Sequence, residues 1–225
     1  MKILAFNTTC KELSVAVLEN ESVLVELNLK TKLSHSEVLC PAIRFCTEKA
    51  NLKINDLNLI ASSTGPGSFT GIRIGLSVLR GMSLSQSIPT VGISCCRALA
   101  SSVNASNTLI CSFIKANKNE NYYGFFKLIE NKLTRICKDN ISTTGNLIEK
   151  IKEKTIFVGD VEVISCYCFD NKIESNDFIF INSNIKASNI AKEAYFKFLE
   201  NKTLKNNPPK ANYLKLSKAE RELRK

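Results

Sequence analysis

The feature that most constrains this chain is a glycine-rich block that follows a buried strand. The apolar run Leu57 to Ala61 predicts the strand, and helical spacing of apolar residues after the block predicts a helix to about Gln86. Between them, Gly65 and Gly67 can adopt positive φ without a Cβ penalty, and Pro66 fixes the bend. The block therefore predicts a tight connection from a strand to the start of a helix.

Two interpretations of this turn stay open. A helix start presents several backbone N–H groups and attracts anions, which would make the turn a vestigial phosphate site built from Gly65, Gly67, Ser68 and Thr70. The alternative is a purely structural connection in which a Ser or Thr caps the helix. The block is neither a Walker loop nor a dinucleotide fingerprint, because no Gly-Lys-Ser/Thr follows and the glycines are spaced differently.

Length and residue content exclude several classes of protein. The 225 residues can form one large domain or two lobes of roughly 100 residues each. No apolar run reaches the ~18 residues of a membrane helix, so we expect a cytoplasmic protein with no membrane partner. The nine cysteines contain no C-x-x-C pair and His35 is the single histidine, so we expect no metal site. The thiols should be reduced, with Cys166 and Cys168 as the pair to test, and His35 should make a local hydrogen bond.

The positive charge gathers at the end of the chain. The net charge is +10, and residues 202–225 hold eight Lys or Arg against two Glu. Two roles for this tail stay open: a solvated charged end, or a segment that contacts RNA or an acidic partner.

The hydrophobic periodicity repeats in two halves. Each half begins with three strands, continues with a helix and a strand, and ends with a strand and a helix; the first half has a further helix in the middle. The corresponding segment 162–175 is expected to be too irregular for a helix. The sequence therefore predicts an α/β protein of two duplicated lobes, the second reduced. The expected divisions are 1–103, 104–204 and a basic tail at 205–225.

The first two helices of the leading half carry apolar stripes. Ser34 and Glu37 have the spacing of a capping box, which predicts the start of the first helix. In the second helix Gly71 and Gly75 lie one turn apart and leave a bare strip. Glycines cost helix stability, so this strip predicts close packing against a partner helix or the sheet.

The duplicated order resembles the actin-like, ribonuclease H-like ATPase fold. Within that fold, four segments resemble the bacterial TsaB (YeaZ) family: Met1 to Thr8, His35 to Pro41, Gly65 to Gly75, and Tyr213-Leu214 before the basic end. The likeness is dense to about residue 97 and sparse afterwards. The glycine block is highly specific to the family.

The resemblance implies a non-catalytic subunit that pairs with TsaD and the ATPase TsaE in making threonylcarbamoyladenosine at position 37 of tRNA. It further implies tRNA contact only through the complex, and a homodimer when TsaD is absent. Both partners would use the first two helices. The interface residues predicted there are Leu39, Ile43, Phe69, Ile72, Arg73, Gly75, Leu76 and Arg80.

Two departures from the family pattern argue against chemistry in this chain. The family usually has Asp where Asn7 stands, at the first phosphate turn, and Asn7 cannot supply that charge to Mg²⁺ or water. A second family segment, usually Asp-Ala-Arg, is Lys115-Ala116-Asn117 here. We therefore expect no catalytic residue, no metal and no cofactor, with Asn7 as part of the vestigial phosphate site. The alternative is an independent actin-fold ATPase or kinase, or an M22-like peptidase.

Overall fold

The computed structural model describes residues 1–173, 176–200 and 208–215 of the chain. They divide into two compact units: the first contains residues 1–95, 185–200 and 208–215, and the second contains the described residues between 96 and 184. This division differs from the predicted boundaries at the end of the chain, because residues 185–200 belong to the first unit rather than to a second lobe. Among the described residues, no helix is both long enough and apolar enough to cross a membrane.

The first unit is built on a five-stranded sheet. Its strands are β1 (Lys2–Asn7), β2 (Leu13–Glu19), β3 (Ser22–Leu29), β4 (Leu59–Ser63) and β5 (Thr90–Ile93). Their order is β3-β2-β1-β4-β5, with β1, β2 and β3 antiparallel and β1, β4 and β5 parallel. The three strands predicted at the start of the first half are therefore present, and they form an antiparallel meander. β1 and β4 are buried along almost all of their length because helices cover both faces of the sheet.

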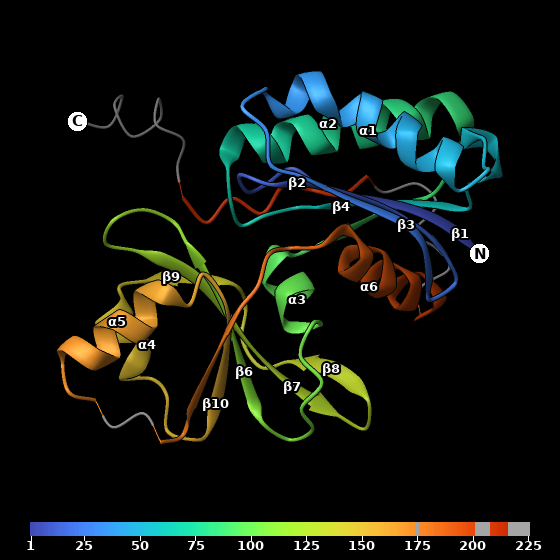
Figure 1. The fold of residues 1–225 in the computed structure, drawn as a ribbon. Helices are drawn as coiled ribbons and strands as arrows, with labels where there is room; N and C mark the ends of the chain where they lie inside the picture. The colour runs from blue at the N-terminus through green and yellow to red at the C-terminus, as the bar shows by residue number, and fades with distance from the viewer. Residues whose placement is uncertain (174–175, 201–207, 216–225) are drawn as a thin grey trace. The chain divides into compact units, whose positions relative to one another are not determined.

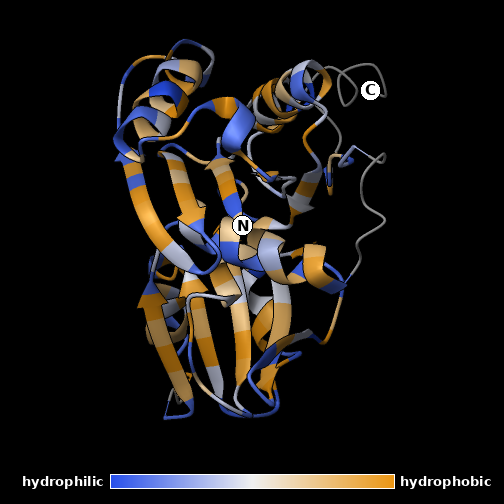
Figure 2. Cartoon of the chain, turned by 90° about the vertical axis from the view of Figure 1, so that its right-hand side faces the viewer, coloured by the Kyte–Doolittle hydropathy of each residue, from blue (hydrophilic) through white to orange (hydrophobic). Residues whose placement is uncertain are grey.

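Two helices cover one face of this sheet and a third covers the other (Figure 1). The pair consists of α1 (His35–Lys49) and α2 (Phe69–Gln86), with the short 3-10 turn η1 (Ile54–Asp56) leading from α1 to β4. The opposite helix is α6 (Ala187–Glu200), which buries Ile190, Ala191 and Ala194. Figure 2 shows apolar residues concentrated along the strands and polar residues in many of the connections.

The start of α1 follows the predicted capping box. The Glu37 carboxylate accepts hydrogen bonds from the Ser34 backbone N–H at 2.8 Å and from Ser34 Oγ at 2.6 Å. These two bonds, the side-chain bond first, lower the pKa of the Glu37 carboxyl. Pro41 lies inside the helix, as its position in the sequence requires.

The second unit repeats the strand order of the first. Its strands are β6 (Leu109–Lys115), β7 (Asn121–Ile129), β8 (Lys132–Arg135), β9 (Asn140–Ser142), β10 (Thr155–Gly159) and β11 (Phe178–Asn182). The order β8-β7-β6-β10-β11 matches β3-β2-β1-β4-β5, including the change from antiparallel to parallel pairs. β9 is an addition that pairs with β7. The predicted duplication is therefore confirmed.

The helices of the second unit differ from the predictions in two ways. α5 (Glu162–Asp170) occupies the segment that was expected to be irregular, and it buries Ile164 and Cys168 one turn apart. The helix predicted after the three leading strands of this half is α4 (Thr144–Ile148), which is only five residues long. α3 (Cys95–Ala100) connects the two units along the chain.

The cysteines are all unpaired with one another in the structure. All nine lie in the described part of the chain and none forms a disulfide. Cys166 is exposed and Cys168 is buried, so the two side chains lie on different faces of α5 and do not form a redox pair. Burial raises the pKa of the Cys168 thiol.

Candidate functional site

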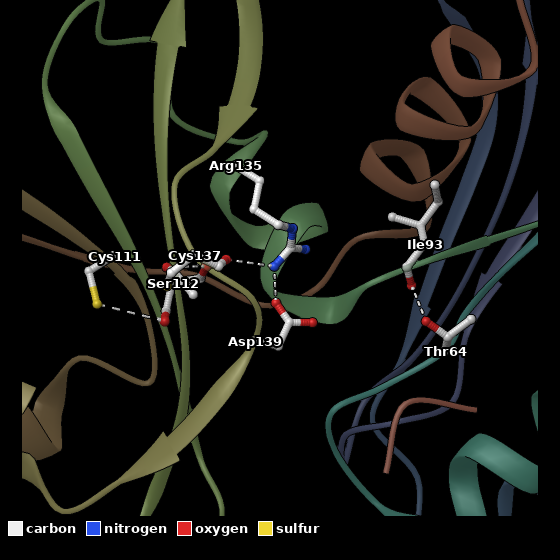
Figure 3. Close-up of polar contacts among 8 residues, drawn as sticks. Thr64, Ile93, Cys111, Ser112, Arg135, Cys137 and Asp139 are labelled. Atoms are coloured by element: carbon white, nitrogen blue, oxygen red, sulfur yellow. Dashed lines mark hydrogen bonds and ion pairs between the residues drawn. The ribbon is translucent and has the colours of Figure 1, made fainter. Parts of the chain in front are cut away.

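The glycine turn between β4 and α2 is held by backbone contacts from three directions. Gly65 has a φ of +104°, a conformation that favours glycine, and its carbonyl accepts from the Cys95 N–H at 2.8 Å. The Thr64 carbonyl accepts from the Asn212 N–H at 2.8 Å, and Thr64 Oγ1 donates to the Ile93 carbonyl at 3.2 Å (Figure 3). The segment 208–215 therefore lies against the turn.

The helix start after the turn uses its N–H groups within the chain. The Ser68 N–H donates to the Thr9 carbonyl at 2.8 Å, and Ser68 Oγ accepts from the Gly71 N–H at 3.2 Å. The predicted Ser or Thr cap is thus present, as Ser68. Of the candidate phosphate-binding residues, Thr70 is exposed and Gly67 packs against Thr9. The Ser68 N–H is one of the groups that would face an anion at this helix start. It already donates its hydrogen bond to the Thr9 carbonyl.

Asn7 stands at the end of β1 with its side chain completely buried. Its amide oxygen accepts from the Ser63 hydroxyl at 2.7 Å and from the Thr9 hydroxyl and N–H at 2.7 and 3.1 Å. Its amide nitrogen donates to Cys10 Sγ at 2.9 Å and to the Ile185 carbonyl at 3.3 Å. The amide therefore ties β1 to β4 and to the approach to α6, and its oxygen is occupied by three donors.

The glycines of α2 lie on two different faces. Gly71 packs on the end of β1: a Cβ there would overlap the Thr8 carbonyl, and Thr8 Oγ1 donates to the Gly71 carbonyl at 2.6 Å. A Cβ at Gly75 would lie 2.6 Å from Thr8 Oγ1. A Cβ at Gly81 would meet nothing within 4 Å. The bare strip of Gly71 and Gly75 thus packs against the sheet of the chain itself. Of these three glycines, only Gly81 faces open space.

Most of the residues predicted to contact a partner are buried inside the first unit. Leu39, Ile43, Ile72 and Leu76 are at most 7% exposed, and Gly75 is buried with them. The prediction of these five as surface residues is wrong, because their stripe is the core-facing side of the two helices. Leu39 and Ile43 belong to the same hydrophobic core as Phe6 and Val15. Phe69 is half-buried, while Arg73 and Arg80 are exposed.

A different set of residues forms the exposed side of the helix pair. We call it the α1/α2 outer face and define it by six residues: Pro41, Phe45, Arg73, Ser77, Gly81 and Leu84. Phe45 is 44% exposed and Leu84 is 85% exposed, although both are large and apolar. The four members on α2 are exposed and follow one another at spacings of four, four and three residues, from Arg73 to Leu84. This spacing places them on one side of the helix.

An aromatic contact between tilted rings joins α2 to the segment 208–215. The Phe69 and Tyr213 ring centroids are 4.7 Å apart, and the Arg73 guanidinium lies 4.0 Å from the Phe69 centroid. Such cation–π contacts contribute about 0.5–1 kcal/mol at exposed sites. Sequence reasoning connected neither Tyr213 nor Asn212 with the glycine block, since residues so far apart in sequence give no local signal of contact.

Histidine and acidic residues do not assemble a metal centre. His35 Nε2 lies 2.7 Å from the Cys10 carbonyl, so its hydrogen bond reaches the turn between β1 and β2 rather than a neighbour in α1. Within the described ranges, no three His, Cys, Asp or Glu side chains come close enough to hold a metal ion. In the second unit, Asn117 Nδ2 donates to Glu120 at 2.9 Å, and the two residues close a turn between β6 and β7.

Comparison with known proteins identifies the family. The family model described as "TsaD: tRNA N6-adenosine threonylcarbamoyltransferase" matches residues 29–225. A protein of Buchnera aphidicola (subsp. Schizaphis graminum) named "tRNA threonylcarbamoyladenosine biosynthesis protein TsaB" is 34% identical over 164 residues, which are 70% of this chain and 78% of that protein. The chain belongs to this family, as a TsaB member. The Bacillus subtilis protein of the same name is 28% identical over 71% of each chain.

The fold of this TsaB family member agrees with that assignment. A Pseudomonas aeruginosa structure described as similar to peptidase YEAZ superposes with a TM-score of 0.79 at 18% identity. The match covers 95% of this chain and 99% of that one. The two units with their repeated strand order have the actin-like ATPase fold, as the sequence predicted.

Proposed function

We propose that this chain acts in tRNA threonylcarbamoyladenosine biosynthesis as a non-catalytic subunit that pairs with TsaD and supports the action of TsaE. Family membership supports the pathway, since the relatives carry that name. The observation that carries the subunit role is the α1/α2 outer face, which exposes large apolar side chains on two neighbouring helices. In this proposal tRNA meets the chain only through the complex.

The absence of chemistry in this chain is supported by the hydrogen bonds of Asn7. A residue that orients water or holds Mg²⁺ at this turn needs an oxygen that is open to a ligand, and preferably a negative charge. The Asn7 amide is neutral, and its oxygen already accepts from Ser63 and Thr9. The buried amide is therefore suited to holding β1 in place rather than to activating a substrate.

The outer face is suited to docking against another pair of helices. Gly81 has open space above it, so a partner helix could approach the α2 backbone closely there. Phe45 and Leu84 supply apolar area on either helix, and burying them would remove that area from water at about 25 cal/mol per Å². The same face would join two copies of this chain when TsaD is absent.

The test compares two exposed apolar side chains on different helices. Leu84 on α2 and Phe169 on α5 are 85% and 86% exposed. Leu84→Asp should weaken TsaD binding by at least about tenfold, because it places a charge in an apolar interface, whereas Phe169→Asp should leave binding unchanged. Calorimetric titration of TsaD into each variant measures the difference. Equal binding by the Leu84→Asp variant and the unmodified chain would exclude the outer face.

Two further measurements address the partners and the enzymatic alternative. Light scattering after size-exclusion chromatography should show that the chain alone forms a homodimer. Addition of TsaD, TsaE and ATP should replace this homodimer by a complex that contains TsaD. The purified chain alone should hydrolyse neither ATP nor peptides. Turnover of ATP by the chain alone that is lost on Asn7→Leu would support an independent actin-fold enzyme instead.

A further inference from the structure

Helix α2 carries positive charge that its own residues do not balance. Its 18 residues include Arg73 and Arg80 but no Asp or Glu. α1 differs, because two acidic residues accompany its two basic ones, and Arg44 pairs with Glu48 at 2.7 Å. The excess positive charge of the helix pair therefore lies on α2.

The two arginines of α2 lie on the same side of the helix as Leu84. Both are exposed, and they are seven residues apart, which is two helical turns or about 10.5 Å along the axis. Leu84 follows Arg80 by about one turn and is 85% exposed. The positive charge therefore borders the most exposed apolar side chain of the α1/α2 outer face.

Neither guanidinium group is neutralised within the described part of the chain. The Arg73 guanidinium lies 4.0 Å from the centroid of the Phe69 ring, which itself contacts Tyr213. This cation–π contact positions the group but supplies no carboxylate. The Arg80 guanidinium forms no ion pair or hydrogen bond with any residue that the structure describes. Both side chains therefore present forked N–H donors of the kind that bind a carboxylate.

Charge distinguishes between the possible occupants of this face. In a symmetric homodimer the same patch meets itself, so the arginines of one copy would repel those of the other. The last ten residues, 216–225, hold four Lys or Arg against two Glu, so their net charge has the same sign as that of α2. A separate protein whose docking surface presents carboxylates is the occupant with complementary charge.

We propose that Arg73 and Arg80 bind carboxylates on the docking surface of a partner protein, and that the same two arginines oppose self-association of this chain. The inference rests on the proposed function, because it specifies the chemistry of the TsaD surface that meets the outer face. Burial of Leu84 and Phe45 stabilises both complexes, whereas the charge of α2 stabilises one and destabilises the other. Salt screens charges, with a Debye length of about 10 Å at 0.1 M. It should therefore weaken the complex with TsaD and strengthen the homodimer.

The test measures both complexes of the full-length chain at about 50 mM and about 500 mM sodium chloride. Calorimetric titration gives the affinity for TsaD, and analytical ultracentrifugation gives the affinity of self-association. Between the lower and the higher salt concentration, we expect the affinity for TsaD to fall about tenfold. Over the same range, the affinity of self-association should rise about threefold.

Matched variants separate the two arginines from the net charge of the chain. At the lower salt concentration, Arg73→Gln with Arg80→Gln should weaken TsaD binding roughly tenfold and strengthen self-association about threefold. Arg73→Lys with Arg80→Lys should keep the salt dependence but lose about threefold in affinity for TsaD, because lysine lacks the planar fork. Lys152→Gln with Lys154→Gln removes the same charge from exposed positions of the second unit and should leave both affinities unchanged. Circular dichroism checks that each variant is folded.

Two results would overturn the proposal. One is that Arg73→Gln with Arg80→Gln leaves the affinity for TsaD and its salt dependence as they are, while Leu84→Asp still weakens binding; the outer face would then dock without help from charge. The other is that the Lys152 and Lys154 control loses as much affinity as the arginine variant, which would reduce the effect to net charge. Absence of TsaD binding by the unmodified chain would overturn the proposed function and this inference with it, so the two kinds of failure are distinguishable.

Discussion

The inner and outer faces of α1 and α2 belong to the same two helices but have opposite surroundings. The inner face packs Gly71 and Gly75 onto the end of β1 and buries Leu39 and Ile72. The outer face leaves Gly81 and the neighbouring apolar side chains open. The difference shows that the strongest apolar stripe of a surface helix serves the core of its own chain first. The residues left for a docking surface are those of the α1/α2 outer face, where apolar and polar side chains are mixed.

The largest effect should come from adding one methyl group on the inner face. Gly71→Ala would place a Cβ on the Thr8 carbonyl, which is backbone and cannot move aside without shifting β1. We expect a loss of about 3 kcal/mol in the free energy of unfolding, measured by urea denaturation. A loss below about 1 kcal/mol would mean that the helix and the strand are less closely packed than the structure shows.

A second test compares two cysteines of α1 through the pH dependence of stability. Cys46 is buried on the inner face, and burial first, then the charge of Glu26, raises its thiol pKa to about 11. The unfolded chain releases this proton at lower pH, so the neutral thiol contributes stability that is complete below about pH 9 and is lost as the pH rises toward 11. We expect this contribution to be about 1–2 kcal/mol.

The measurement is the difference between each variant and the unmodified chain in urea unfolding at pH 8 and pH 11. Cys46→Ala should reduce the loss of stability between these two pH values. Cys40→Ala, at an exposed position of the same helix, should leave the loss of stability between pH 8 and pH 11 unchanged. Identical pH profiles for the two variants would contradict the placement of Cys46 in the core.

The smallest effect should be a gain. Gly81→Ala adds a methyl group where nothing lies within 4 Å, and alanine has the higher helix propensity. Thermal unfolding should show a stabilisation of about 0.5–1 kcal/mol, opposite in sign to Gly71→Ala. A destabilised Gly81→Ala variant would show that this position is packed against part of the chain.

Local signals predicted most of the fold. Ser34 and Glu37 marked the start of α1, and the alternation of the leading strands marked the meander, because caps and pleats depend on near neighbours. Helix α5 escaped prediction because Val163, Tyr167 and Phe169 have modest helix propensity. Its helical form depends on burying Ile164 and Cys168 one turn apart, which is a tertiary effect.

The candidate site was harder to predict, for two physical reasons. Periodicity shows which residues share a face but not what covers that face, so the buried stripe was assigned to a partner. The contacts of Asn212 and Lys197 with the β4–β5 region join residues more than 100 positions apart, and no short-range pattern encodes them. The cap at Ser68 was foreseen because all of its atoms lie within one turn.

The order of the two units along the chain has a consequence for synthesis on the ribosome. Residues 96–184 emerge as one continuous stretch and can fold as soon as they leave the exit tunnel. Residues 1–95 emerge earlier, yet one side of their sheet lacks its helix until translation has passed residue 200. Throughout that interval the nascent polypeptide carries an uncovered apolar layer, which makes it a natural client for chaperones that bind growing chains.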